Sequence, residues 1–183
     1  MLWRKILTLD VKITSALRIH EDQKWMRPIG TFFAHSGDSW FILLVLAFLW
    51  FFTFGEWRKL TILVGIAVII LALLVLSIKF LIKRQRPEGT WGAIYRNSDP
   101  HSFPSGHAAR TMMLGTLVLL LGHPWIGVIL LVWAILVSLA RVGMGVHYFS
   151  DIFAGIFLGG LFAFGFVALV PWILTLVPAF FLN

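Results

Sequence analysis

The chain has 183 residues, of which 60% are hydrophobic and only 13% are charged. Soluble domains usually contain about 45–50% apolar and about 25% charged residues. This composition therefore excludes a disordered chain, a nucleic-acid-binding domain and an ordinary cytosolic enzyme. We predict an all-α integral membrane protein with one domain over residues 1–183. The sequence contains no cysteine, which excludes disulfides and thiolate metal sites.

Residues 1–27 alternate apolar and charged side chains at approximately helical spacing, and basic residues are frequent among them. This pattern is typical of an amphipathic helix that lies on the membrane surface rather than crossing it. The segment lacks the long apolar core of a signal peptide. We therefore expect residues 1–27 to form an interfacial helix.

Five apolar stretches follow and predict a transmembrane bundle over residues 39–183. Each supplies about 17–23 residues, which suits a bilayer core of about 30 Å. Pro171 is expected to end or kink the last of them. Residues 83–103 form the longest polar loop, and long loops often carry function. The stretches are Ser39–Phe54, Leu60–Ile82, Ser105–Leu121, Trp125–Val142 and a last one that begins near Ser150.

Polar residues gather first where the second predicted span ends. Lys79 and Arg86 lie about two helical turns apart, and Pro87 follows. Two such cations can hold an anion, and arginine can do so with two parallel hydrogen bonds. The alternative is that both side chains reach toward the interface and anchor the end of a helix.

A second polar group opens the third predicted span. Pro104 and Ser105 are typical of a helix start. Backbone N–H groups of Ser105 and Gly106 would then be free to bind an anion. His107 beside them could donate a proton. The alternative is a plain helix cap with an interfacial histidine.

The third group runs from Arg141 to Asp151. His147 and Asp151 are four residues apart, so on a helix they would share one face. The carboxylate could fix the imidazole tautomer and leave the other ring nitrogen as a nucleophile. A structural pair is one alternative. A metal site is another, which the neighbouring cations disfavour because they would repel the ion.

Alternating spans would bring these three groups to the same side of the membrane. Ionisable residues at membrane depth are costly and mark functional sites. Three cations require an anion with more than one charge, and phosphate fits. A histidine paired with an aspartate, together with a second histidine, suits phosphoryl transfer by a nucleophile and a general acid. The sequence has no P-loop and no paired carboxylates for magnesium.

These residues resemble the type-2 phosphatidic acid phosphatase superfamily, the lipid phosphate phosphatases. The family signature reads Lys-x6-Arg-Pro, then Pro-Ser-Gly-His, then Ser-Arg-x5-His-x3-Asp. The chain matches it over about residues 79–151, in the same order. It departs at Ala140, where the family usually has serine. The matching segments are Lys79-x6-Arg86-Pro87, Pro104-Ser105-Gly106-His107 and Arg141-x5-His147-x3-Asp151.

The resemblance implies a helical bundle of the short bacterial type, with its site at the ends of the core helices. It implies hydrolysis of a lipid phosphate or diphosphate without a metal or other cofactor. By analogy, His147 attacks phosphorus and forms a phosphohistidine, Asp151 orients it, and His107 protonates the leaving oxygen and then activates water. The phosphoryl oxygens would be held by Lys79, Arg86, Ser105, Gly106 and Arg141. Arg110, one turn after His107, could contact a second phosphate.

The candidate substrates are a polyprenyl diphosphate, such as the undecaprenyl form, and a glycerophospholipid phosphate such as phosphatidylglycerol phosphate. A lipid A 1-phosphatase and a phosphotransferase are alternatives on the same fold. A non-catalytic lipid-binding or transport protein is the alternative from another class. The resemblance implies a bacterial cytoplasmic membrane with the site on the extracytoplasmic side, although the basic N-terminal segment on that side favours the opposite orientation.

Overall fold

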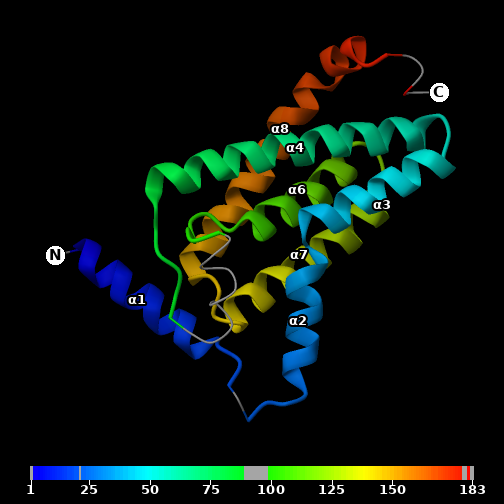
Figure 1. The fold of residues 1–183 in the computed structure, drawn as a ribbon. Coiled ribbons are helices and arrows are strands. Elements are labelled where there is room, and N and C mark those ends of the chain that lie inside the picture. The colour runs from blue at the N-terminus through cyan, green and yellow to red at the C-terminus, as the bar shows by residue number, and fades with distance from the viewer. Residues whose placement is uncertain (1, 21, 89–98, 179–180, 182–183) are drawn as a thin grey trace.

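The computed structural model describes residues 2–20, 22–88, 99–178 and 181, and its regular elements are all helices (Figure 1). One isolated bridge joins Gln85 and His101. The all-α prediction is confirmed. The helices are α1 (Leu2–Ala16), α2 (Met26–Ser36), α3 (Ser39–Phe52), α4 (Glu56–Ile82), α6 (Gly106–Leu120), α7 (Pro124–Gly143) and α8 (Phe149–Leu176).

Each of the five predicted apolar stretches forms a helix, but their lengths differ. Within the described residues, α4, α7 and α8 are long and apolar enough to cross a membrane alone. Helices α2 and α3 reach that length only as a pair, which bends by 61° at the break between them. Helices α3 and α6 have 14 and 15 residues. At 1.5 Å per residue each is about 21–23 Å long, shorter than the bilayer core.

Helix α6 is the centre of the bundle and packs against α4, α7 and α8. Its Met113 and Leu117 are fully buried, as is Leu71 of α4. Glycines let the backbones approach closely: a Cβ at Gly159 of α8 would collide with the carbonyl of Ala109. Small residues at such crossings are typical of membrane helix pairs. The central position of α6 explains how a short helix stays inside the bundle.

The N-terminal segment differs from the single helix predicted over residues 1–27. Helix α1 ends at Ala16, and α2, which the sequence did not predict, begins at Met26. In α1 the exposed side chains include Leu9 and Val11, whereas the polar Asp10 and Thr14 are buried. Lys5 and Lys12 are also exposed, and this mixture of apolar and basic side chains suits a helix that lies at the membrane surface.

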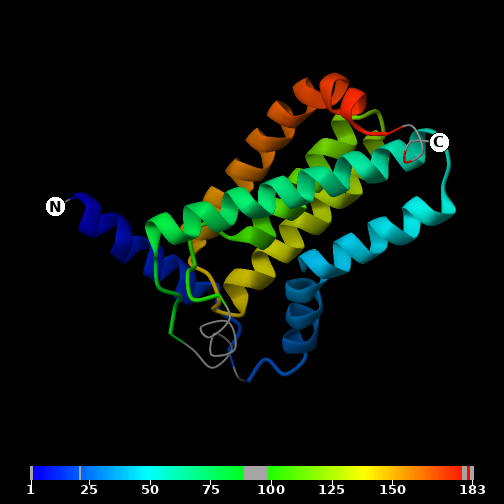
Figure 2. The same ribbon diagram turned by 45° about the horizontal axis from the view of Figure 1, so that its top comes forward.

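The sequence predicted that Pro171 would end or kink the last helix, and α8 does not end there. It continues through this proline to Leu176. Figures 1 and 2 show that its last turns bend away from the axis of the preceding part. A proline inside a helix removes one backbone hydrogen bond and favours such a bend.

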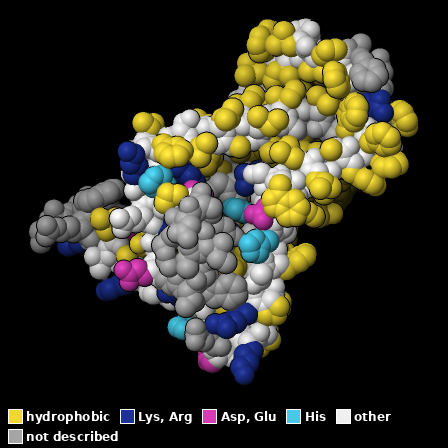
Figure 3. Space-filling model, viewed as in Figure 1, with side chains coloured by type: hydrophobic (Ala, Val, Ile, Leu, Met, Phe, Trp, Pro, Cys, Tyr) yellow, Lys and Arg dark blue, Asp and Glu magenta, His cyan; other side chains and the backbone are white. Residues whose placement is uncertain are grey.

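The surface divides into an apolar part and a charged part. Figure 3 shows apolar side chains over α3, α4 and the end of α8, and most of the visible Lys and Arg side chains toward the opposite end. Figures 1 and 2 place α1 and α2 at this charged end. The candidate site residues lie at the same end of the bundle.

Candidate active site

A cavity of about 470 Å³ opens where α3 and α6 begin and α4 ends. Its polar lining comes from all three predicted groups and from two further acidic residues. Its apolar wall is formed by Trp40 of α3 and by Ala72, Val75 and Leu76 of α4. The cavity is thus polar toward the loops and apolar toward the membrane-facing helices. The charged or titratable side chains that line it are those of Asp38, Lys79, Asp99, His107, Arg110 and His147.

The three cations of the signature are buried at this end of the bundle. Lys79 is 5% exposed, Arg86 5% and Arg141 1%. The carboxylate of Asp99 forms an ion pair with Lys79, and it accepts a hydrogen bond of 2.8 Å from Nη2 of Arg86. An anionic group therefore contacts two of the three cations that the sequence predicted to bind phosphate. Unpaired buried cations would be costly.

His147 lies beside these cations and is 1% exposed. Its Nε2 atom is 3.2 Å from Nη1 of Arg86, and its Nδ1 atom is 3.5 Å from Oδ2 of Asp151. Burial lowers the pKa of His147 well below 6.5, and the positive charges of Arg141, Arg86 and Lys79 lower it further. The imidazole is therefore neutral at pH 7, the form that carries a nucleophilic lone pair.

The side chain of Asp151 caps the N-terminus of α8. His147 precedes this helix, so the pair does not share a helical face as predicted, yet the two side chains still meet. The Tyr148 N–H donates to Oδ2 of Asp151 at 2.9 Å, as part of a capping box. Arg84 donates to Oδ1 at 2.8 Å. With no exposed area, this carboxylate is fully fixed by the protein.

The second predicted group forms the start of α6, with Ser105 at its N-cap. The backbone N–H of Ser105 donates to the carbonyl of Asp151 at 3.0 Å. This N–H is therefore not free for an anion, in contrast to the prediction, because the start of α6 packs against the first turn of α8. Gly106 and His107 do line the cavity.

His107 contacts an aspartate that its own motif does not contain. Its Nε2 atom lies 2.6 Å from Oδ1 of Asp38, at the break between α2 and α3. Asp38 occupies the N-cap position of α3, as the sequence suggested, but makes no side-chain capping bond there. Its side chain instead faces the cavity. The only sequence signal was its place directly before an apolar stretch.

Arg110 lines the cavity and is 8% exposed. Its Nε donates to the carbonyl of Gly37 at 3.3 Å, next to Asp38. Ala140, where the family usually has serine, is buried in a small apolar cluster with Ala34 of α2 and Met144. It does not line the cavity, so the departure from the signature affects packing against α2.

Three residues of the site were not predicted from sequence: Asp38, Asp99 and Arg84. All three are charged residues outside the helices, and their sequence surroundings are typical of a helix cap or a polar loop. Within the described part of the chain, no three His, Asp or Glu side chains gather in a way that could hold a metal ion.

Four signature residues thus line one cavity, namely Lys79, Gly106, His107 and His147, and Arg86 and Asp151 contact His147 from outside its lining. The family profile of the PAP2 superfamily matches residues 60–174, more than half of the chain. The chain belongs to the PAP2 superfamily.

Two curated relatives match about a third of the chain. An undecaprenyl-diphosphatase from Sulfolobus acidocaldarius is 42% identical over 65 residues, which are 35% of this chain and 31% of the relative. A lipid A 4'-phosphatase from Bacteroides thetaiotaomicron is 35% identical over 66 residues, 36% of this chain and 29% of that protein. The chain therefore spans about a third of the length of these curated relatives.

Two solved PAP2-related structures match over most of their length. The first is a transmembrane PAP2-type phosphatidylglycerolphosphate phosphatase from Bacillus subtilis. It has a TM-score of 0.77 and 25% identity, over 92% of this chain and 88% of that one. The second, LpxE from Aquifex aeolicus, has a TM-score of 0.67 and 25% identity, over 87% of this chain and 95% of that one. The predicted membrane-bundle fold is confirmed by these similarities.

Proposed function

We propose that the protein is a membrane phosphatase that hydrolyses a phosphate monoester or diphosphate on a lipid, without a metal ion. The observation that carries this proposal is a neutral, buried His147 placed between the Asp151 carboxylate and buried cations, at a cavity with an apolar wall. Both curated relatives and the similar Bacillus subtilis protein are named as phosphatases, which supports the same class.

In the proposed reaction, Nε2 of His147 attacks phosphorus and the bond between phosphorus and the lipid oxygen breaks. His107 supplies the proton that the leaving oxygen needs. A water molecule then attacks the phosphohistidine, His107 takes a proton from this water, and inorganic phosphate leaves. Preorganised cations stabilise the charge that develops on the phosphoryl oxygens. Lys79, Arg86 and Arg141 would do so, with the N–H of Gly106, once the phosphoryl group replaces Asp99.

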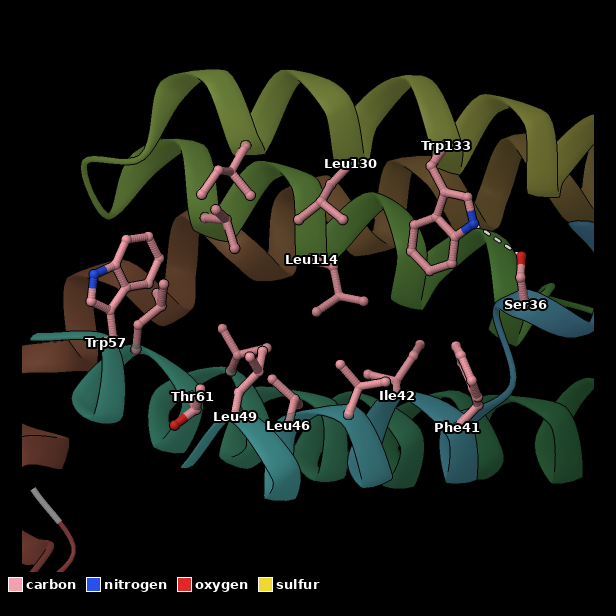
Figure 4. A pocket seen from close by; sticks show the side chains of 15 residues that line it. Ser36, Phe41, Ile42, Leu46, Leu49, Trp57, Thr61, Leu114, Leu130 and Trp133 are labelled. Carbon is pink, nitrogen blue, oxygen red and sulfur yellow. Dashed lines mark hydrogen bonds between the residues drawn. The ribbon is translucent and has the colours of Figure 1, made fainter. Parts of the chain in front are cut away.

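The apolar surroundings support a substrate with a hydrocarbon chain. A second cavity, of about 430 Å³, lies among α3, α4, α6 and α7. Figure 4 shows Leu130 and Trp133 of α7 on one side of it and Ile42 of α3 on the other. At the end toward the active site, the indole N–H of Trp133 donates to Oγ of Ser36 at 2.9 Å.

For the lipid, we propose a polyprenyl diphosphate or a glycerophospholipid phosphate. Arg110 supports a diphosphate, because it lines the cavity on the same helix as His107 and could bind a second phosphate. A phosphohistidine can also pass phosphate to acceptors other than water, so a phosphotransferase is the nearest alternative. A lipid-binding or transport protein would need the cations but not the His147–Asp151 pair.

Phosphate release by detergent-purified protein tests the proposal. The panel should contain undecaprenyl diphosphate, phosphatidylglycerol phosphate, phosphatidic acid and lipid A 1-phosphate. We expect turnover of at least one, loss of turnover with retained lipid binding in His147→Ala, inhibition by vanadate and no effect of EDTA. Full turnover by His147→Ala would refute the mechanism, and absence of turnover on the whole panel would favour a binding protein.

We propose that the site faces the extracytoplasmic side of a bacterial cytoplasmic membrane, following the resemblance to the family. Because the chain has no cysteine, single cysteines can report this. Glu88 is exposed near the site and Glu56 is exposed at the other end of α4. An impermeant thiol reagent on intact cells should label Glu88→Cys and spare Glu56→Cys. The opposite pattern would reverse the orientation.

A further inference from the structure

We propose that Arg84, held in place by Asp10 of α1, is a positioning residue that fixes the Asp151 carboxylate against His147. Arg84 lies inside the x6 spacer of the first motif, so the signature does not assign it. This inference rests on the proposed function, since it concerns how the same site is held for catalysis.

Arg84 is bound from several directions. Its Nη1 donates to Oδ1 of Asp151 at 2.8 Å and to Oγ of Ser150 at 2.6 Å. Its Nη2 donates to Oδ2 of Asp10 at 2.6 Å. The guanidinium also lies 4.0 Å from the centre of the Tyr148 ring. The planar fork of arginine suits two carboxylates at once, which lysine cannot match.

The two oxygens of Asp151 have different tasks. Oδ1 accepts from Arg84, whereas Oδ2 accepts from the Tyr148 N–H and faces Nδ1 of His147. Without Arg84, Oδ1 would lose its charged partner in a fully buried place. Ser102 and the backbone N–H of Tyr148 would remain as partners, but neither carries a charge, so the carboxylate would be held less firmly against the imidazole.

Asp10 connects this network to the N-terminal helix. The carboxylate accepts from the backbone N–H of Ser150 at 2.9 Å and from its hydroxyl at 2.5 Å. Thr14, one turn later, accepts from the N–H of Phe149 at 3.0 Å. These are first-turn N–H groups of α8, which have no partner within their own helix. Helix α1 therefore caps the helix that carries Asp151.

The membrane-surface helix thus becomes part of the catalytic assembly. The polar face of α1 binds Arg84 and the start of α8, while Leu9 and Val11 point outward. The guanidinium of Arg84 is bound by Asp10, Ser150 and Asp151 rather than directed at the substrate cavity, which Arg84 does not line. Its loss should therefore lower kcat and leave KM nearly unchanged, which separates positioning from substrate binding.

We would compare Arg84→Gln and Arg84→Lys on the substrate that the wild type turns over. Misplacing a reacting group by about 1 Å can cost about 100-fold in rate. We expect Arg84→Gln to lose up to about this factor in kcat, with KM within about twofold, and Arg84→Lys to lose less. Lys83→Gln is the matched control, since Lys83 is exposed one residue earlier, and should keep the wild-type kcat.

The pH profile gives a readout that loss of stability alone would not move. Removing the positive charge of Arg84 makes it easier for the His147–Asp151 pair to bind a proton. The acid limb of the pH profile, where kcat/KM falls as the pH is lowered, should therefore move to higher pH in Arg84→Gln. It should stay in place in Lys83→Gln. The charged or titratable groups that surround this pair are Asp10, Lys79, Arg84, Arg86, His107, Arg141 and Tyr148.

Asp10→Asn tests the link to α1 and is the milder change if Arg84→Gln does not fold. It keeps one oxygen acceptor but removes the charge, and we expect a smaller loss of kcat with the same unchanged KM. Wild-type kcat and an unmoved acid limb in both variants would overturn the inference. A rise in KM alone would also overturn it, because it would make Arg84 a substrate contact.

Thermal unfolding separates this inference from the proposed function. The losses in Tm of Arg84→Gln and Asp151→Asn should be non-additive in the double variant, whether or not the protein has turnover. Additive losses would overturn the link between the two residues. Lack of wild-type turnover on every lipid would refute the proposed function, and with it the catalytic role of the link, even where the coupling is present.

Discussion

Nε2 of His107 lies 2.6 Å from Oδ1 of Asp38, although 69 residues separate them in the chain. The bend of 61° between α2 and α3 brings Asp38 to the cavity. A Cβ at Gly37 would lie only 3.3 Å from the ring of His107, so the glycine allows the break to approach α6. The second histidine of the site therefore has an acidic partner, as His147 does.

Asp38→Asn should lower kcat/KM by about 10- to 100-fold, a part of the 10²–10⁴ that general acid–base catalysis contributes. The reason is that an amide neither orients nor stabilises the protonated His107 as a carboxylate does. Steady-state phosphate release checks this. His35→Gln is the matched control, since the exposed His35 is 3.4 Å from the other oxygen of Asp38. Equal losses in the two variants would contradict a specific role for the Asp38–His107 pair.

The proposed phosphatase activity should persist on mild acidification. Burial, Arg141, Arg86 and Lys79 hold the pKa of His147 well below 6.5, so the neutral nucleophile persists as the pH falls through 6.5. The acid limb of kcat/KM should therefore lie below pH 6.5. In Arg141→Gln, the loss of a neighbouring cation should raise the pKa of His147 and move the limb of the residual activity upward. A wild-type limb above pH 6.5 would contradict this account.

Arg110→Ala should slow hydrolysis of a polyprenyl diphosphate more than that of a lipid monophosphate. Loss of a charged hydrogen bond to the second phosphate would cost about 1.5–3 kcal/mol, roughly 10- to 150-fold in kcat/KM. The ratio of the two kcat/KM values is the measurement. Equal slowing of both substrates would exclude contact with a second phosphate and make Arg110 a support for Gly37.

Gly159→Ala should destabilise the bundle, because the added Cβ would collide with the carbonyl of Ala109 on α6. Overpacking of this kind costs about 1–3 kcal/mol, and thermal unfolding in detergent would measure it. Gly160→Ala is the matched control, since a Cβ at this position meets nothing within 4 Å. A similar Tm for both variants would contradict the close packing of α6 and α8.

The sequence predicted the helices with long apolar stretches to within a few residues. Helix α7, for example, spans Pro124–Gly143, against a predicted 125–142. It did not predict α2, because Pro28 and Gly30 interrupt a short apolar segment that follows a charged one. It also placed the end of the N-terminal helix too late. Boundaries without a strong hydropathy change depend on tertiary contacts, such as the hydrogen bond of 2.8 Å from the Ile19 N–H to the carbonyl of Gly143.

For the site, the signature identified Lys79, His107 and His147 because their spacing is specific. The structure adds Asp38 and Asp10, whose partners lie 69 and 74 residues away. Nothing local distinguishes these aspartates from an ordinary cap or a charge on a surface helix. Only the bend between α2 and α3 and the packing of α1 on α8 give them their roles.

The buried cations and both histidines lie at one end of the bundle, where α4 and α7 end and α6 begins. A phosphate headgroup cannot be drawn across about 30 Å of hydrocarbon to reach them. If the proposed reaction takes place here, the enzyme acts on the lipids of a single leaflet. A lipid that is synthesised in the other leaflet must be carried across the membrane before its phosphate can be removed. The dephosphorylated product then remains in the leaflet that contains the active site.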